Sequence, residues 1–493
     1  MPLDGYFGMA SAAGHPAGAP PSRLLVRTFW LWPALLTLLI TGYQLDGAPL
    51  WRDELATWSA ASRPPADLLR MAGNVDGVAG AYYLLMRGWI GIFGDSVTAL
   101  RLPAALCMAA AAGLTALLGG RLFDIRTGLV AGLLFAVVPS TSRYGQEARP
   151  YALATLLAVL ATLLLVRALD RPTWRRWLDY AGAVLGLGLA HLLAVSLLTG
   201  HLVAVGAAWY RTRDRRRLRW LPALLPAALL LAPLALTGRR QQDRQLDWVG
   251  VPGLADLAEL PGNILQAEAV GGILVGLAAV GAATRGGRGA ALGLCVLLPA
   301  ALLFAGGRVT PLWVPRYLVF VVPFACLLAA AAVTPLRLRV ALPIVALVCV
   351  LGAPEQASLR RTHESPRSAP ADYPGATRII ADQRRDGDAI VFSPRDRWAF
   401  LDLAAAYYLR EAVPRDVLAV RDQADRADLW VTECAEPARC LAGTDRVWLL
   451  VKGERADPLS GVAAPKAGPL RADFSITKVW TVPGLTVVLL TRR

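Results

Sequence analysis

Long apolar runs without a charged residue constrain this chain more than any other feature. A helix that crosses the hydrocarbon core of a bilayer needs about 20 mostly apolar residues. We predict spans at the charge-free runs Thr28–Leu45, Leu102–Gly120, Thr127–Ser142, Pro150–Val166, Tyr180–Tyr210, Trp220–Gly238, Ala269–Thr284, Gly289–Gly307, Tyr317–Leu336 and Val340–Pro354. With 55% hydrophobic residues and a mean hydropathy of +0.46, the chain is predicted to be an all-α polytopic membrane protein.

The run Tyr180–Tyr210 is too long for a single span. As one helix it would extend about 46 Å, against a hydrocarbon core of about 30 Å. Arginine clusters flank it at Arg171–Arg176 and Arg211–Arg219, and both should be cytoplasmic by the positive-inside rule. An even number of crossings must separate them. We therefore predict two short helices with a turn near His191, and about eleven spans in total.

The net charge of +15 does not indicate nucleic-acid binding, because the arginines occur in short clusters. They lie between apolar runs, which is how membrane topology is encoded. The predicted inner positions are the N-terminus with Arg23 and Arg27, and loops that hold Arg121 with Arg126, Arg285 with Arg288, and Arg337 with Arg339. The predicted outer loops are Gln44–Arg101, Arg143–Arg149, Arg239–Glu268 and Arg308–Arg316.

The last part of the chain is charged, and its apolar runs are short. Buried strands are predicted at Ala389–Phe392, Val417–Val420 and Val447–Val451, a helix at Trp398–Arg410, and a hairpin from Ile476–Val482 and Thr486–Thr491 around Pro483-Gly484. We therefore predict a cytoplasmic tail (residues 1–27), a transmembrane domain (28–354) with a long first outer loop (44–101), and a small extracytoplasmic α/β domain (355–493).

The six cysteines divide into two kinds. Four lie in apolar runs and are predicted to be core thiols. Cys434 and Cys440 lie in the predicted outer domain, where oxidising conditions favour a disulfide between them over free thiols. The sequence contains no CxxC or HExxH motif, so a protein-built zinc site is not supported.

Paired carboxylates directly after the first span are the most functional-looking feature. Asp53 and Glu54 lie between Trp51 and Trp58, where the chain leaves the membrane. Sugar transfer from a phosphate donor needs a general base for the acceptor hydroxyl and positive charge for the departing phosphate. Arg143, Arg149 and Arg316 in the outer loops offer that charge. The alternatives are solvated carboxylates and arginines that reach lipid headgroups.

Several different short motifs follow one another along the chain. They are Trp51-Arg52-Asp53-Glu54, Asp76 six residues before Tyr82-Tyr83-Leu84-Leu85, Phe93-Gly94-Asp95-Ser96, Leu100-Arg101-Leu102-Pro103, Tyr144-Gly145-Gln146-Glu147-Ala148-Arg149-Pro150-Tyr151 and Arg316-Tyr317. In these motifs the chain resembles the GT-C superfamily of membrane glycosyltransferases. The similarity is greatest to the bacterial relatives in family 39, the protein mannosyltransferase and aminoarabinose transferase group. It is dense over Leu50–Asp170 and thin afterwards.

The resemblance implies an inverting, multi-pass plasma-membrane enzyme with an extracytoplasmic active site. It would move a sugar, mannose by default, from a polyprenyl-phosphate donor to a protein, lipid or glycan acceptor. Asp53 would be the catalytic aspartate and Glu54 its acidic partner. The resemblance and the outer-loop chemistry together suggest as substrate-binding residues Asp76, Tyr82, Arg143, Tyr144, Gln146, Glu147, Arg149, Tyr151, Arg316 and Tyr317.

One element of the family pattern is missing. Many relatives carry Asp-x-His-Pro-Pro before the tyrosine pair, but here Asp76 is followed by Gly77-Val78-Ala79-Gly80-Ala81. This argues against any metal or acceptor role that the His has in relatives. Some members of the superfamily use a divalent cation and others do not, so the resemblance assigns no metal. Two other functions remain as alternatives: a transporter or flippase of a lipid-linked sugar, and a non-catalytic scaffold or receptor. His191 is expected to be a packing residue more often than a ligand.

Overall fold

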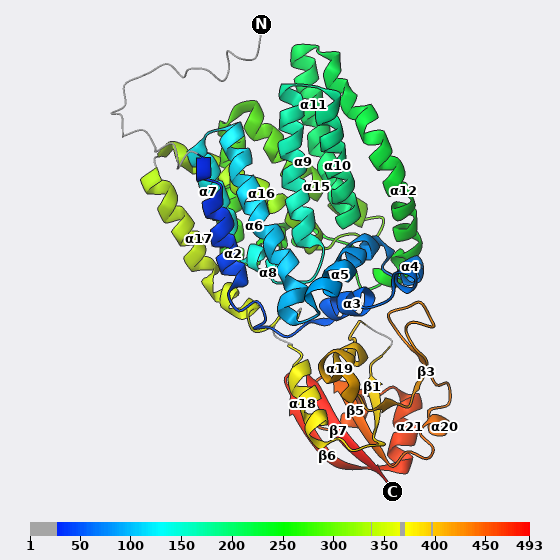
Figure 1. The fold of residues 1–493 in the computed structure, drawn as a ribbon. Helices are drawn as coiled ribbons and strands as arrows, with labels where there is room; N and C mark the ends of the chain where they lie inside the picture. Colours follow the sequence, from blue (N-terminus) through cyan, green and yellow to red (C-terminus); the bar gives the residue numbers. More distant parts are fainter. Residues whose placement is uncertain (1–26, 337, 365–369, 396–397) are drawn as a thin grey trace.

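The computed structural model describes residues 27–336, 338–364, 370–395 and 398–493. A bundle of long helices carries a small α/β domain at one end, and short helices of the first outer loop lie between the two (Figure 1). The predicted fold class is confirmed: a helical, multi-pass membrane domain is followed by a small C-terminal domain built around a sheet. The predicted tail of residues 1–27 lies, except for Arg27, outside the described residues.

The bundle contains helices of very different length. Its elements are α2 (Leu31–Gly42), α6 (Val97–Leu122), α7 (Ile125–Val137), α8 (Pro139–Gly145), α9 (Tyr151–Asp170), α10 (Trp174–Ala190), η3 (Leu192–Leu197), α11 (Leu198–Thr212), η4 (Arg215–Arg219), α12 (Trp220–Gln245), α13 (Leu254–Leu265), α14 (Glu268–Thr284), α15 (Gly286–Gly307), η5 (Pro315–Val321), α16 (Val322–Val333), η6 (Thr334–Leu336) and α17 (Leu338–Leu359). In the described part of the chain, seven helices are long and apolar enough to cross a membrane, or up to nine if each of two bent pairs is one span. The count of about eleven therefore stays a prediction.

The long apolar run Tyr180–Tyr210 does not form one continuous helix. Helix α10 ends at Ala190, His191 has an extended backbone, and η3 leads into α11. Two short helices with a turn near His191 were predicted, and this part of the prediction is confirmed. The turn also brings His191 out of a helix and into the wall of the cavity described below.

The arginine-rich loops gather at one end of the bundle. Arg121, in the last turn of α6, forms an ion pair with Asp170, at the end of α9. Arg219, at the end of η4, donates from Nη1 to the carbonyl oxygen of Pro172 at 3.3 Å. The α6–α7, α9–α10 and α11–α12 connections therefore lie side by side, as expected if all three face the same side of the membrane. Arg337 lies outside the described residues.

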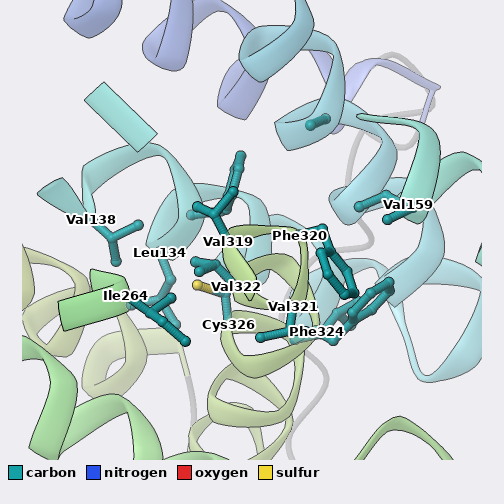
Figure 2. Packing of buried hydrophobic residues seen from close by; sticks show 14 of the residues in the cluster. Leu134, Val138, Val159, Ile264, Val319, Phe320, Val321, Val322, Phe324 and Cys326 are labelled. Carbon is teal, nitrogen blue, oxygen red and sulfur yellow. The ribbon is translucent and has the colours of Figure 1, made fainter. Parts of the chain in front are cut away.

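The bundle is packed closely around α16. Phe320 and Phe324 contact a cluster that includes Leu134 of α7 and Val159 of α9 (Figure 2). Small residues let the backbones approach: a Cβ on Gly281 of α14 would lie 2.0 Å from a carbonyl oxygen of α16. Close packing of this kind stabilises helices in lipid, where apolar burial alone offers little.

Four short helical segments of the first outer loop form a layer under the bundle. They are α3 (Arg52–Ala61), α4 (Pro65–Asn74), η2 (Gly77–Ala79) and α5 (Gly80–Phe93). The short apolar stretches Leu68–Met71 and Tyr82–Ile92 fall within α4 and α5. Helix α3 was not predicted as a helix, because its apolar residues have no clear periodicity.

The C-terminal domain is built on a mixed five-stranded sheet in the order β2-β1-β5-β7-β6. Its strands are β1 (Ala389–Ser393), β2 (Arg415–Asp416), β5 (Arg446–Lys452), β6 (Phe474–Val482) and β7 (Leu485–Arg492), beside a small pair β3 (Ala419–Arg421) and β4 (Thr432–Glu433). Strand β1 is parallel to β2 and β5, whereas β7 is antiparallel to β5 and β6. Its helical segments are α18 (Tyr373–Gln383), α19 (Leu401–Leu409), η7 (Arg410–Ala412), α20 (Pro437–Cys440), η8 (Pro458–Gly461) and α21 (Ala464–Asp473).

Most sequence-predicted elements of this domain are present. The hairpin around Pro483-Gly484 forms as β6 and β7. The strand predicted at Val417–Val420 is wrong: β2 ends at Asp416 and β3 begins at Ala419, because the Asp416 carboxylate accepts from the backbone N–H of Ala419 and turns the chain. The predicted domain boundary at residue 354 falls in the last turns of α17.

Candidate active site

A cavity of about 1300 Å³ lies between the end of the bundle, the outer-loop helices and the C-terminal domain. Every segment that was predicted to lie on the outer side contributes to its wall. The charged and aromatic side chains of its lining include Arg52, Asp53, Asp76, Arg149, Tyr151, His191, Arg239, Trp248, Arg316, Tyr317, Trp398, Phe400, Lys452 and Arg455. Segments distant in the sequence therefore meet at one site, on the face away from the arginine-rich loops.

Asp53 lies in the first turn of α3, and its side chain is 14% exposed. It forms an ion pair with Arg316 of η5, whose Nη2 lies 3.6 Å from Asp53 Oδ2. Helix N-termini favour carboxylates, because the unpaired N–H groups there carry partial positive charge. The position thus keeps a carboxylate partly accessible from the cavity and close to a fixed cation.

A second acidic group at the cavity, Asp76, comes from the segment between α4 and η2. Asp76 adopts a left-handed backbone conformation with φ 52° just before η2. Its carboxylate accepts a hydrogen bond from the hydroxyl of Tyr83 and lies 3.8 Å from Arg149 Nη1. Arg149 also donates to the Tyr83 hydroxyl oxygen at 3.1 Å. This triad fixes the Arg149 guanidinium at the cavity wall.

Glu54 has a different environment from its neighbour. It is fully buried and accepts from Nε and Nη2 of Arg101, at 2.8 and 2.7 Å, and from the backbone N–H of Ala148 at 2.9 Å. Burial alone would raise the pKa of Glu54, but the charge and hydrogen bonds of Arg101 outweigh it and hold the pKa well below the usual range. Glu54 does not line the cavity; it ties α3 to α6 and to the second outer loop.

The second outer loop is also largely buried. Gln146 donates from Nε2 to the carbonyl oxygens of Thr41 and Tyr43, at 2.8 and 2.9 Å. Arg143 Nη1 lies 3.2 Å from Glu147 Oε2. Burial raises the pKa of Glu147 to about 7, although Arg143 acts against this. These contacts place Gln146 and Glu147 beneath the cavity wall.

The linker after α17 is connected to the same region. Arg143 donates from Nη2 to the carbonyl oxygen of His363 at 2.9 Å. Glu364 lies 4.0 Å from Arg52 Nε and accepts from the Tyr373 hydroxyl at 3.2 Å. Burial raises the pKa of Glu364, and Arg52 opposes that rise. The linker thereby positions the C-terminal domain against the first turn of α3.

The sequence-predicted site residues fall into two groups. Those that line the cavity are Asp53, Asp76, Arg149, Tyr151, Arg316 and Tyr317. Those that lie behind the wall are Glu54, Tyr82, Arg143, Tyr144, Gln146 and Glu147. Tyr83, rather than Tyr82, contacts Asp76. Sequence reasoning missed the wall contributed by the C-terminal domain, although the ends of its predicted buried strands were a usable signal.

The described residues contain no group of three or more His, Cys, Asp or Glu side chains that could hold a metal ion. The carboxylates at the cavity are paired with arginines instead: Asp53 with Arg316, and Asp76 with Arg149. This donor set does not fit a protein-built metal site. Positive charge for a phosphate is available from the two guanidinium groups.

Known proteins resemble this chain in sequence over one part and in fold over nearly all of it. Residues 80–236 match the family model described as dolichyl-phosphate-mannose-protein mannosyltransferase. No curated protein sequence matches the chain. Among solved structures, ArnT from Cupriavidus metallidurans bound to undecaprenyl phosphate matches with a TM-score of 0.62 at 14% identity, over 94% of this chain and 98% of that one.

The chain has a GT-C-like fold. The apo state of the same ArnT gives a TM-score of 0.62 at 15% identity, again over 94% and 98% of the two chains. The arabinofuranosyltransferase AftD from mycobacteria gives 0.52 at 16% identity, over 94% of this chain and 40% of that one. The resemblance to GT-C membrane glycosyltransferases is therefore confirmed by both fold and family model.

Proposed function

We propose that this GT-C-like protein is a glycosyltransferase that uses a polyprenyl-phosphate sugar. The observation that carries the proposal is the Asp53 carboxylate in the cavity, 3.6 Å from Arg316. A carboxylate beside a fixed cation meets the two needs of sugar transfer, a base for the acceptor and charge for the phosphate. That solved ArnT binds undecaprenyl phosphate supports a lipid-phosphate donor.

In the proposed reaction, Asp53 accepts the proton of an acceptor hydroxyl. The hydroxyl oxygen attacks the anomeric carbon of the donor sugar while the bond between that carbon and the phosphate oxygen breaks. Arg316 and Arg149 stabilise the charge on the departing polyprenyl phosphate. Because a single displacement occurs opposite the phosphate, the anomeric configuration inverts.

The finer assignments come from the same reasoning. The family-model match supports mannose as the first sugar to test. Tyr151 and Tyr317 in the cavity wall, whose rings stack with centroids 6.4 Å apart, are suited to contact the donor. We place Glu54 among the positioning residues, because its buried carboxylate forms an ion pair with Arg101. The cavity and the C-terminal domain are assigned to the extracytoplasmic side.

The test uses the purified protein in lipid nanodiscs, supplied with radiolabelled polyprenyl-phosphate-mannose, other lipid-phosphate sugars and membrane extracts as the acceptor source. Asp53→Asn keeps the shape of the side chain but removes the base, so transfer should fall at least about a hundredfold. Asp67→Asn is the matched control, because Asp67 lies in the same outer loop, pairs with Arg70 and does not line the cavity.

Near-normal transfer by Asp53→Asn would remove Asp53 from the mechanism. Movement of intact lipid-linked sugar across the bilayer, without a glycosylated product, would instead favour the transporter alternative. Binding of the donor lipid with neither transfer nor transport would favour a scaffold.

A further inference from the structure

The parallel neighbours β1 and β5 of the C-terminal sheet are followed by helices that pack on opposite faces of the sheet. After β1 the chain continues into α19, whose Leu403 packs in one cluster with Phe392 of β1. After β5 it continues into η8 and α21, whose Leu459 and Leu470 pack in another cluster with Val391. Alternate residues of β1 therefore contact helices on the two sides of the sheet.

Such a divergence opens a crevice at the carboxyl ends of the two strands. In open α/β sheets, ligands bind at this point, where neighbouring connections leave to opposite sides. Here the residues that follow β1 and β5 form one wall of the Asp53 cavity: Trp398 and Phe400 after β1, and Lys452 and Arg455 at the end of β5. Figure 1 shows β1 and α19 on the side of the domain that faces α3.

The aromatic part of this wall is braced from behind. The Trp398 ring meets Phe400 edge-on at a centroid distance of 5.7 Å and Trp430 at 4.8 Å. Arg244 of α12 lies over the Trp430 ring at 4.9 Å and forms an ion pair with Asp428. The wall is thus fixed to the bundle as well as to the sheet.

The charge of the cavity exceeds what one donor phosphate requires. Its described lining carries six basic side chains, Arg52, Arg149, Arg239, Arg316, Lys452 and Arg455, and two acidic ones, Asp53 and Asp76. Arg149 and Arg316 are paired with these carboxylates. Among described residues, Lys452 and Arg455 have no ion-pair partner, and both are exposed to the cavity.

Like charges also lie close to one another there. Partial burial in the cavity wall lowers the pKa of Lys452, and the nearby charge of Arg52 lowers it further, although Glu364 opposes this. Positive groups that repel one another are stabilised when an anion binds between them. Arg52 and Asp53 are consecutive residues of α3 and both line the cavity, so an anion held near Arg52 lies in the same cavity as the proposed base.

We propose that the crevice at the carboxyl ends of β1 and β5 is an acceptor subsite that binds an anionic group through Lys452 and Arg455. The anion is a phosphate or carboxylate on the acceptor, and its binding presents an acceptor hydroxyl to Asp53. The inference rests on the proposed function, since it assigns the second substrate of that reaction. The C-terminal domain is then a substrate-binding part of the site, and the donor occupies the side of Arg149 and Arg316.

The test is equilibrium binding, measured by titration calorimetry on the full chain in nanodiscs. Three probes differ in one group: methyl glucoside, methyl glucoside 6-phosphate and methyl glucuronide. At least one anionic probe should bind about tenfold more tightly than the neutral one, and Lys452→Gln should remove that advantage, as expected for loss of a hydrogen bond between charged groups. The preferred anionic probe separates a phosphate from a carboxylate acceptor.

Lys478→Gln is the matched control, because Lys478 is an exposed lysine of β6 outside the cavity and its loss changes the net charge equally. Arg455→Gln, with the exposed Arg471→Gln as its control, is the second variant. Equal binding of all three probes, no binding of any, or equal effects of Lys452→Gln and Lys478→Gln would overturn the subsite. Weaker binding of polyprenyl phosphate in Lys452→Gln would assign the cations to the donor and also overturn it.

Binding of the probes does not require turnover, so the two proposals fail separately. Absence of sugar transfer with intact, Lys452-dependent binding of an anionic probe would contradict the proposed reaction only. Transfer that depends on Asp53, together with charge-independent binding, would contradict the acceptor subsite only.

Discussion

Asp53 and Glu54 are adjacent in the sequence, yet the fold gives them opposite environments. Successive helical residues project about 100° apart, so one side chain of the pair points to the cavity and the other into the protein. Asp53 keeps partial access to solvent beside Arg316. Glu54 is enclosed by Arg101 and the backbone of the second outer loop. One carboxylate is thus available for chemistry, and the other supports it.

Loss of the Glu54 charge should destabilise the protein more than loss of the Asp53 charge. Glu54→Gln leaves the fully buried Arg101 without its counter-ion, and removing one partner of a buried pair typically costs about 3–5 kcal/mol. We expect a clear fall in the thermal unfolding midpoint of Glu54→Gln in nanodiscs. Asp53→Asn, which changes a partly exposed group, is the control and should unfold near the wild-type temperature. Equal midpoints for both variants would show that the pair with Arg101 does not stabilise the fold.

At the scale of elements, short irregular segments decide which groups reach the cavity. The break between α10 and α11 places His191 at the cavity wall, and the short 3₁₀ helix η5 before α16 does the same for Arg316. Irregular backbone at membrane depth is tolerated where it lines a cavity inside the protein. These two irregular segments of the bundle therefore both contribute to the site.

The disulfide of the C-terminal domain, which closes a short loop, gives a prediction at the scale of elements. The structure joins Cys434, after β4, to Cys440, in α20. We expect peptides from non-reduced native membranes to contain this disulfide when analysed by mass spectrometry, because oxidising conditions on the outer side favour it. Closing so short a loop contributes about 2 kcal/mol in the loop-entropy model. Recovery of both cysteines as alkylated free thiols would contradict the bridge and the outer location of the domain.

At the scale of the whole molecule, the two ends of the helical bundle differ. Arginine-rich loops gather at one end of the bundle, and the cavity with the C-terminal domain lies at the other. The positive-inside rule predicts that the first end is cytoplasmic. In that orientation, the proposed lipid-linked donor would reach the cavity from the outer leaflet.

The corresponding prediction concerns topology. A reporter enzyme that is active only outside the cytoplasm should be active when fused after Arg493 and silent when inserted at Arg215. Arg215 begins η4 at the arginine-rich end, whereas Arg493 follows β7 of the C-terminal domain. A cytoplasmic green fluorescent protein fused at the same two positions is the reciprocal control. Reporter activity at both positions would overturn the assigned orientation and the parity of the spans.

The sequence by itself determined the membrane class, the break near His191, the hairpin of the small domain and the outer-loop segments that meet at the cavity. These follow from local rules: apolar length, charge placement and side-chain alternation act within a short stretch of chain. Only the tertiary structure decided that Glu54 pairs with Arg101, that Tyr83 rather than Tyr82 reaches Asp76, and that Lys452 and Arg455 line the same cavity as Asp53. Helix rotation and the docking of distant segments set these contacts, and neither is encoded in the spacing of neighbouring residues.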